Sequence, residues 1–400
     1  MRIGIIKETK SPVDNRVPLD PAQVAALKTK YPKHDIVVQS SDIRAYSDDE
    51  YRSHGVEVVA DLSDCDLLLG IKEARSETII PGKHYIFFGH VAKMQEYNRP
   101  LLQSMIERGI TFSDYEYMVD DNGLRVCAFG WWAGCVGVYY TLRAYGLRTD
   151  EFTLPPPHLN FTLNELIATL KAVKLPAVKV LVTGNGRVSH GVQHVLNAIG
   201  AQAMTSDEFL ATDKVETLSY SVADVDRLVK SHDGSAFSFH AFLSHPDNYH
   251  SDFDKWSQAA DVLMCGHFWN PKAPVYLGPE ELRHTLIKVI GDITCDIMGS
   301  VKSTLRSSTH DNPFYDYNPD TEQEEPAFSS AKNITVMAVD TCPNALPRDT
   351  STHFGQALIE HIFEPLLQGN EPDALERATI LRKGVLTPHF NYLTAFAKGD

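Results

Sequence analysis

The chain has 400 residues, which is long for a single hydrophobic core and favours two domains. Its 43% hydrophobic and 22% charged residues are typical of a soluble globular protein. The formal net charge of −15 argues against binding to nucleic acid or to an anionic membrane surface, because both reward clustered lysine and arginine. We therefore expect neither kind of partner.

Six cysteines are scattered along the chain without a C-x-x-C pair, which favours buried free thiols in a reducing compartment and argues against a zinc site. The amino-terminal residues predict a strand and no signal peptide, and no uninterrupted apolar run is long enough for a membrane span. These features predict a cytoplasmic protein that holds no metal. The sequence does not indicate an oligomeric state.

Strands and helices alternate through the first part of the chain. Asp20 and Pro21 are typical of a helix start, and apolar runs predict strands at residues 3–6, 36–38, 56–59, 67–71 and 85–89. This alternation predicts an α/β fold with a mainly parallel sheet. Three charged or titratable segments directly follow strands: Lys7-Glu8, Lys72-Glu73 and His90. Parallel sheets bind ligands at the carboxyl ends of their strands, so these segments are candidate site residues.

A helix is predicted at residues 95–108 and a strand at 110–112, and the glycine-spaced segment 129–147 predicts a buried helix that crosses between two domains. A strand at 178–182 then meets a turn that carries Gly184, Gly186 and Gly191 and opens a helix. Such a turn lets backbone amides and the positive end of a helix approach a pyrophosphate. Ser189 stands where the usual pattern has its third glycine, so an ordinary strand-to-helix turn is an equally good interpretation of this stretch alone.

The run Ser206-Asp-Glu lies roughly 20 residues past the first glycine, where a dinucleotide fold usually places the residue that contacts the adenosine ribose. Neither a carboxylate nor an arginine ends a strand cleanly there, so NAD and NADP both remain open. The histidine-rich stretch 212–259 matches no metal-ligand spacing and predicts surface helices and loops. The remaining segments predict strands at 261–265, 286–290 and 335–339, a loop at 312–325, and helices at 354–367 and 372–383.

Lys7-Glu-Thr-Lys followed by Asn15-Arg16-Val and Pro21 resembles the amino-terminal signature shared by alanine dehydrogenase, the transhydrogenase nucleotide-binding subunit and lysine-forming saccharopine dehydrogenase. Further blocks resemble the saccharopine side of this superfamily, above all the lysine–2-oxoglutarate reductase domain of the bifunctional lysine-degradation enzymes. These blocks are Gly70-Ile-Lys-Glu, Phe87-Phe-Gly-His-Val-Ala-Lys, Asp114-Tyr-Glu-Tyr-Met-Val, Arg125-Val-Cys-Ala-Phe-Gly-Trp-Trp, Gly291-Asp-Ile-Thr-Cys-Asp-Ile and Leu386-Thr-Pro-His-Phe. The resemblance covers nearly the whole chain.

The resemblance implies two Rossmann-like domains with parallel twisted sheets and a cleft between them. The substrate domain would be discontinuous, with residues 1–135 and 310–400, and the dinucleotide-binding domain would span residues 136–309. The second domain of the bifunctional enzymes has no counterpart in these 400 residues.

The implied activity is the interconversion of saccharopine with L-lysine and 2-oxoglutarate, by hydride transfer between NAD or NADP and a carbon–nitrogen bond. Lys72 and His90 match the acid–base pair of the family, and Glu116 matches a nearby acid that tunes their pKa values. The substrate-binding residues would be Arg16, Arg125 and Phe129. The cofactor-binding residues would be Gly184, Gly186, Arg187, Val188, Gly191, Asp292 and Asp340.

Two alternatives remain on the same fold. One is an alanine dehydrogenase-like enzyme that deaminates another amino acid. The other is a catalytically silent sensor of nucleotide or amino acid, although a sensor has no need of an acid–base pair. The physiological direction, synthesis or breakdown of lysine, is not determined by these residues.

Overall fold

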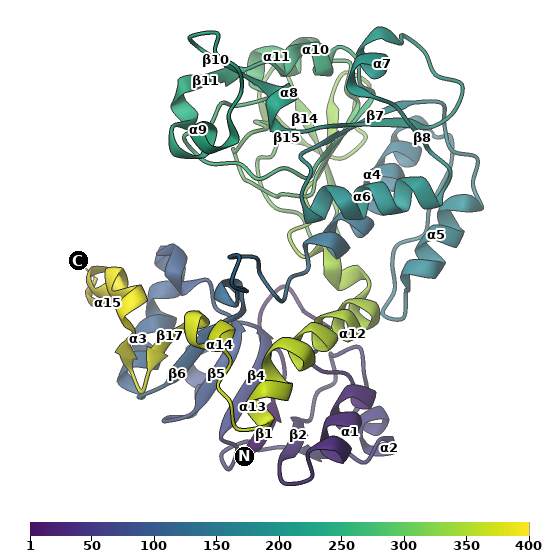
Figure 1. Cartoon of the computed structure of the whole chain (residues 1–400). Helices are drawn as coiled ribbons and strands as arrows, with labels where there is room; N and C mark the ends of the chain where they lie inside the picture. The colour runs from purple at the N-terminus through teal and green to yellow at the C-terminus, as the bar shows by residue number, and fades with distance from the viewer. Residues whose placement is uncertain (400) are drawn as a thin grey trace. The chain divides into compact units, whose positions relative to one another are not determined.

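The computed structural model describes residues 1–399 and divides into two compact units. The first comprises Met1–Phe129 together with the segment that begins at Pro347, and the second comprises Gly130–Leu346. Each unit contains its own eight-stranded, mainly parallel sheet (Figure 1). The α/β class expected from the alternation of strands and helices is therefore confirmed.

The sheet of the first unit has the strand order β18-β17-β6-β5-β4-β1-β2-β3, in which only β17 and β18 run antiparallel to their neighbours. Its strands are β1 (Arg2–Ile5), β2 (Asp35–Gln39), β3 (Glu57–Val59), β4 (Leu67–Lys72), β5 (His84–Phe88), β6 (Thr111–Asp114), β17 (Thr379–Arg382) and β18 (Val385–Leu386). The helices of this unit are α1 (Pro21–Lys30), α2 (Asp48–Ser53), α3 (Arg99–Glu107), α12 (Pro347–Leu358), α13 (Glu364–Leu367), α14 (Asp373–Ala378) and α15 (Thr394–Lys398).

Local sequence explains how these elements begin and where they are buried. Helix α1 starts with the expected cap, since the Asp20 side chain accepts a hydrogen bond from the backbone of Gln23 and the Gln23 side chain accepts one from the backbone of Asp20. Strand β4 is apolar on both faces and buried along Leu67–Ile71, as a central parallel strand requires.

The sheet of the second unit has the order β15-β14-β16-β13-β12-β7-β9-β8, with β14 and β15 antiparallel. Its strands are β7 (Lys179–Thr183), β8 (Gln202–Ala203), β9 (Ser219–Ala223), β12 (Val262–Cys265), β13 (Val289–Asp292), β14 (Phe314–Asn318), β15 (Gln323–Glu325) and β16 (Ile334–Met337), and a separate hairpin joins β10 (Val229–Ser231) to β11 (Tyr249–Ser251). The helices are α4 (Gly130–Thr149), α5 (Leu163–Lys171), α6 (Arg187–Ala198), α7 (Ser206–Ala211), α8 (Val225–Leu228), α9 (Phe239–Ser244), α10 (Asp254–Ser257) and α11 (Pro279–His284).

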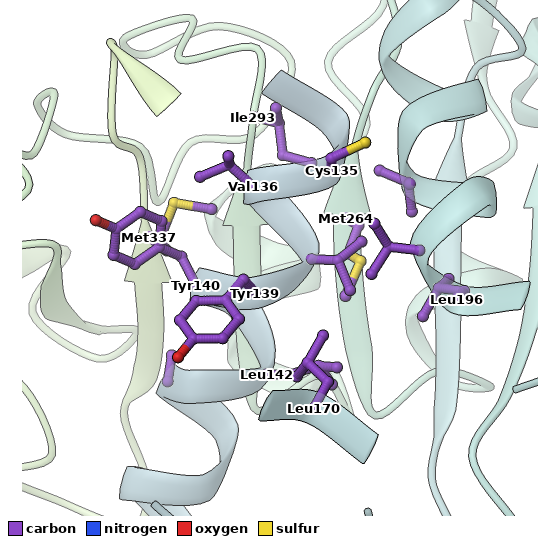
Figure 2. Close-up of a cluster of buried hydrophobic side chains, with 14 of the residues drawn as sticks. Cys135, Val136, Tyr139, Tyr140, Leu142, Leu170, Leu196, Met264, Ile293 and Met337 are labelled. Carbon is purple, nitrogen blue, oxygen red and sulfur yellow. The ribbon is translucent and has the colours of Figure 1, made fainter. Parts of the chain in front are cut away.

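Helix α4 forms the centre of the second unit's core. Its side chains Cys135, Val136, Tyr139 and Tyr140 are fully buried among apolar side chains of the sheet and of neighbouring helices (Figure 2). The glycines of α4 allow α6 to approach it, because a Cβ on Gly134 would lie 2.0 Å from a backbone oxygen of α6. The prediction of a buried, glycine-spaced helix is confirmed.

Three sequence-based predictions of local structure are wrong. Residues 219–223, within the stretch 212–259 that predicted surface helices and loops, form a mostly buried strand, because β7 and β8 pair with it on its two sides. Residues 314–318 and 323–325 form edge strands where a loop was expected. Residues 379–382 form a strand paired with β6, where a helix was expected.

The units also differ from the expected domain boundaries. Residues 310–346 supply β14, β15 and β16 to the sheet of the second unit, because β16 pairs with β13 and β14 with β16. The second unit begins at Gly130, because the whole of α4 packs within its core. These strand pairings join segments that are distant in sequence, so the pattern of local elements does not reveal them.

Candidate active site

Four neighbouring strands of the first unit end in titratable residues. Lys72 ends β4, Asp114 ends β6, Glu8 follows β1, and His90 follows β5. Strands β1, β4, β5 and β6 are parallel and adjacent, so their carboxyl ends share one edge of the sheet. The expected meeting of Glu8, Lys72 and His90 at one sheet edge is confirmed, and Asp114 joins them.

Glu8 is buried and connects β1 to β4. Its Oε1 accepts the backbone N–H of Ile71 at 2.6 Å and its Oε2 accepts that of Lys72 at 3.0 Å. Burial, followed by the charge of Asp14, raises the pKa of Glu8 to about 8. The Glu8 carboxyl is therefore largely protonated at neutral pH.

Arg16 forms a buried ion pair with Asp14. The guanidinium donates from Nε to Oδ1 at 2.9 Å and from Nη2 to Oδ2 at 2.5 Å. Its carbon Cζ lies 4.2 Å from the centre of the Phe129 ring, and that ring stacks on Phe354 with centroids 4.5 Å apart. Burial opposes ionisation of Asp14, but the Arg16 guanidinium outweighs it and holds the pKa of Asp14 below its usual value. The structure thus brings together two predicted substrate-binding residues, Arg16 and Phe129.

His90 lies in the left-handed backbone region, with φ 53°. Asp114 supports this conformation, because its Oδ2 accepts the backbone N–H groups of Gly89 at 3.1 Å and His90 at 3.0 Å. Burial lowers the pKa of His90 to about 4, and the charge of Lys72 contributes in the same direction. His90 is therefore neutral at neutral pH. Burial also raises the pKa of Asp114 to about 7.

The carboxylates of Glu73 and Glu116 lie near His90. The Nδ1 atom of His90 lies 3.9 Å from Oε2 of Glu73, whose other oxygen is paired with Lys10. Glu116 Oε1 contacts Lys93 Nζ at 3.0 Å and Arg125 Nη2 at 2.7 Å. Burial alone would raise the pKa of Glu116, but Lys93 and Arg125 together lower it.

Two buried carboxylate oxygens of this cluster, Glu73 Oε2 and Glu116 Oε2, accept no hydrogen bond from any described residue. Unpaired buried acceptors of this kind are costly and are commonly satisfied by a ligand or by water. The predicted residues Lys72, His90 and Glu116 thus lie in a cluster in which two carboxylate oxygens can still accept hydrogen bonds from a ligand or from water.

Sequence reasoning missed several members of this cluster as candidate site residues. A consistent use of the strand-end rule would have found Asp114, which ends β6, and the pair Lys72-Glu73 already contained Glu73. Asp14 and Lys10 lie in a loop and Lys93 ends a short 3-10 helix, and no local pattern distinguishes them from solvated charges.

In the second unit, the glycine turn joins β7 to α6. Gly184 has φ +79°, a conformation that favours glycine, and a Cβ there would lie 2.6 Å from the Cα of His267. A Cβ on Gly186 would meet nothing within 4 Å, so the space beside it is open. Gly186 is also the N-cap of the twelve-residue helix α6 and supplies no side chain to cap its first N–H groups. This turn has the features of an anion site at a helix N-terminus.

His267 was not anticipated, although it follows strand β12 and the strand-end rule applies to it. Its Nδ1 lies 2.6 Å from Thr183 Oγ1, at the end of β7, and its Nε2 lies 2.8 Å from Ser300 Oγ. Burial lowers the pKa of His267 to about 4. The neutral ring thus packs beside the glycine turn and is linked to its first strand through Thr183.

The other predicted cofactor residues separate into two groups. Arg187 and Val188 begin α6 beside the turn, as expected. Gly191 instead lies against α4, where a Cβ would come within 1.9 Å of the Trp131 carbonyl oxygen, so it is a helix-packing glycine and does not border the turn. The expected role of Gly191 at the pyrophosphate therefore needs correction.

Asp292 and Asp340 are also placed differently from each other. Asp292 ends β13 and is buried, and its two oxygens accept hydrogen bonds from Thr294 Oγ1 and Thr304 Oγ1, both at 2.6 Å. This carboxylate is already engaged within the protein and stabilises the loop after β13. Asp340 is exposed after β16, at the carboxyl side of the sheet.

Within residues 1–399, no group of three or more His, Cys, Asp or Glu side chains could hold a metal ion. No helix in the same part of the chain is long and apolar enough to cross a membrane.

Residues 4–136 match the family model described as "Alanine dehydrogenase/PNT, N-terminal domain". Among curated proteins, the whole chain aligns with an alpha-aminoadipic semialdehyde synthase of Arabidopsis thaliana at 29% identity, over 42% of that protein. The chain thus spans less than half the length of this relative. A saccharopine dehydrogenase [NAD(+), L-lysine-forming] of Candida glabrata is 26% identical, with 88% of each chain covered.

Among solved structures, an L-alanine dehydrogenase superposes with a TM-score of 0.67 at 18% identity, covering 98% of this chain and 99% of that chain. A transhydrogenase from Sinorhizobium meliloti gives a TM-score of 0.62 at 14% identity, covering 97% of this chain and all of that chain. These two likenesses show the fold. The family model and the sequence relatives support the resemblance to saccharopine dehydrogenases within the alanine dehydrogenase and transhydrogenase superfamily.

Proposed function

We propose that the chain is an oxidoreductase that interconverts saccharopine with L-lysine and 2-oxoglutarate. In the forming direction, the lysine ε-amine attacks the keto carbon, water leaves, and the resulting imine is reduced at carbon and protonated at nitrogen. A reduced nicotinamide cofactor supplies the hydride when bound. The names of the relatives support this reaction, and the residues of the first unit offer acid–base groups for its proton transfers.

The observation that carries the proposal is the position of Lys72 and His90 in one cluster at the sheet edge. Lys72 is close enough to both His90 and Asp14 for its charge to affect their pKa values. A neutral His90 is a proton acceptor at neutral pH, and Lys72 is a proton donor when charged. We assign to Lys72 the protons of imine formation and hydrolysis, and to His90 the proton of the amine that changes with hydride transfer.

Arg16 and Arg125 are proposed to bind substrate carboxylates. Asp14 holds Arg16 through Nε and Nη2, so the guanidinium plane is fixed while Nη1 donates to no described residue. A fixed planar guanidinium loses little entropy when it binds a carboxylate. Arg125 Nη2 contacts Glu116, so a substrate carboxylate would share Arg125 with that residue or displace it.

Gly184, Gly186 and Arg187 are proposed to hold the pyrophosphate of the dinucleotide. The open space beside Gly186 and the uncapped first turn of α6 fit an anionic group. Backbone N–H groups would neutralise part of its charge there, and the positive end of the helix would add to this.

The test mixes the full chain with lysine, 2-oxoglutarate and reduced nicotinamide cofactor and follows oxidation of the cofactor. Turnover that needs both lysine and 2-oxoglutarate is the expected result. Turnover with alanine and oxidised cofactor, and none with lysine and 2-oxoglutarate, would instead assign alanine dehydrogenase chemistry. Cofactor binding without turnover on any amino acid and keto acid would indicate a sensor.

A further inference from the structure

Asp114 is the last residue of β6, and its side chain lies against the chain where it leaves β5. In the parallel pairing of these strands Asp114 is opposite Phe87, so Gly89 and His90 follow just beyond the paired residues. The backbone passes close to β6 at this point, because a Cβ on Gly89 would lie 2.6 Å from the Phe112 ring. Asp114 itself is fully buried.

The Asp114 carboxylate accepts three backbone N–H groups that belong to two different loops. Its Oδ2 accepts those of Gly89 at 3.1 Å and His90 at 3.0 Å, in the loop after β5. Its Oδ1 accepts that of Glu116 at 2.9 Å and caps the one-turn 3-10 helix Tyr115–Tyr117 after β6. A single side chain thus joins the backbone of His90 to the backbone of Glu116.

The loop after β5 has a strained conformation that these contacts hold. His90 and Met94, at the two ends of the short 3-10 helix Val91–Lys93, both lie in the left-handed region, with φ 53° and 54°. Residues other than glycine remain in this region only where the surrounding structure holds them there. Lys93 Nζ also contacts Glu116 Oε1 at 3.0 Å, so the two loops are joined through side chains as well.

We propose that Asp114 is a positioning residue that fixes the His90 imidazole relative to the Glu116 carboxylate for proton transfer. The inference rests on the proposed function, because it is there that His90 is assigned a proton. Proton transfer requires groups within hydrogen-bond reach, and a displacement of about 1 Å can reduce the rate strongly. Asp114 acts through His90 and Glu116, since its carboxylate oxygens are occupied by backbone N–H groups.

Two substitutions release the loops in different ways. Asp114→Asn leaves one acceptor oxygen, so it can hold the N–H of Glu116 or those of Gly89 and His90, but not both sets. Asp114→Ser keeps a hydroxyl of the kind that caps helix starts, and this can serve Glu116. The serine side chain is one bond shorter than that of aspartate, so it is expected to release the loop after β5. Circular dichroism identifies which variants fold.

The kinetic test compares the effect of Asp114→Asn in two backgrounds. In the otherwise unmodified chain, each Asp114 variant is expected to lower kcat about tenfold or more. In a chain that already carries His90→Gln and Glu116→Gln, Asp114→Asn is expected to change kcat by less than about twofold, because the groups it positions are gone. A merely structural effect would lower kcat by the same factor in both backgrounds.

Asp316→Asn is the matched control. Asp316 is a fully buried aspartate of β14 in the second unit, and it too accepts hydrogen bonds with both oxygens. Its Oδ2 accepts the backbone N–H of Ser329 at 3.0 Å, and its Oδ1 accepts the hydroxyl of Thr335 at 2.8 Å. Asp316→Asn is expected to lower the melting temperature and to change kcat by less than about twofold.

The position of the His90 ring is also measured without turnover. The His90 and Phe88 rings are stacked, with centroids 6.3 Å apart and an interplanar angle of 19°. In the full chain with labelled histidine and phenylalanine, the nuclear Overhauser signal between these two rings reports their distance. This signal is expected to weaken in Asp114→Asn and Asp114→Ser and to remain in Asp316→Asn.

An unchanged ring-to-ring signal in a folded Asp114 variant would overturn the proposal, as would an equal loss of kcat in both backgrounds. Failure of both Asp114 variants to fold would also overturn it, because Asp114 would then be required for folding and not for positioning. Absence of turnover in the unmodified chain would refute the proposed reaction. A weakened signal in the Asp114 variants would in that case still show that Asp114 sets the position of His90.

Discussion

The carboxyl group of Glu8 holds the backbone of Lys72, because its Oε2 accepts the Lys72 N–H at 3.0 Å. The same side chain accepts the N–H of Ile71 at 2.6 Å and so fixes the end of β4 from the loop that follows β1. Lys72, one member of the proposed acid–base pair, therefore extends from a backbone that the loop after a neighbouring strand keeps in position.

Stability is expected to depend on pH through Glu8. Its pKa is raised by burial from 4.5 to about 8, so the folded chain holds a proton that the unfolded chain releases between these values. The stabilisation is complete below pH 4.5 and is lost as the pH rises towards 8, at up to about 1.4 kcal/mol per pH unit. When urea unfolding is measured from pH 4.5 to pH 8, Glu8→Gln should remove this contribution to the slope of the unfolding free energy against pH.

The control for Glu8→Gln is Glu107→Gln, which changes an exposed carboxylate on α3. It should keep the slope of the unmodified chain. Identical slopes in Glu8→Gln and the unmodified chain would show that Glu8 is ionised in the folded state.

Lys72→Met and His90→Gln are each expected to lower kcat about tenfold or more, because each removes one proton-transfer group. Circular dichroism should show that both variants fold. Lys33→Met is the matched control, since Lys33 is exposed and precedes β2, at the amino end of the strands. Unchanged kcat in both site variants would exclude the assigned acid–base pair.

Gly186 and Gly191 are expected to respond differently to alanine. Gly186→Ala adds a methyl group that meets nothing within 4 Å, so stability should be unchanged while cofactor affinity falls. Gly191→Ala places a Cβ 1.9 Å from the Trp131 carbonyl oxygen and should destabilise the fold by about 1–3 kcal/mol. Thermal unfolding and cofactor titration of both variants distinguish cofactor binding by Gly186 from helix packing by Gly191. A stable Gly191→Ala protein with weakened cofactor binding would show instead that Gly191 contributes to the cofactor site.

His267 is expected to make the fold sensitive to acid. Burial lowers its pKa from 6.5 to about 4, so the unfolded chain takes up a proton that the folded chain resists. Its contribution to stability is complete above pH 6.5 and is lost as the pH falls towards 4. Between pH 7 and pH 4.5, the melting temperature of His267→Gln should therefore fall less than that of the unmodified chain. The melting temperature of His240→Gln, a variant at an exposed site, should fall as much as that of the unmodified chain. An equal loss in all three would contradict a buried neutral His267.

Local patterns in the sequence were sufficient for the α/β class, the capped start of α1, the glycine turn, and the placement of Lys72 and His90 after their strands. Each of these depends on neighbours within a few residues, where apolar periodicity, capping and backbone preference act directly. The match of many such blocks to one family extended this to the expected reaction and to the arginines that would bind its carboxylates.

Only the tertiary structure decided the rest, because strand order and side-chain burial depend on contacts between residues far apart in the chain. The pairing of β9 with β7 placed the end of β9, and not that of β8, beside the glycine turn. The packing of α6 on α4 made Gly191 a contact glycine. Burial beside Asp14 makes Glu8 a protonated group that holds Lys72, since desolvation acts only once the chain has folded around it.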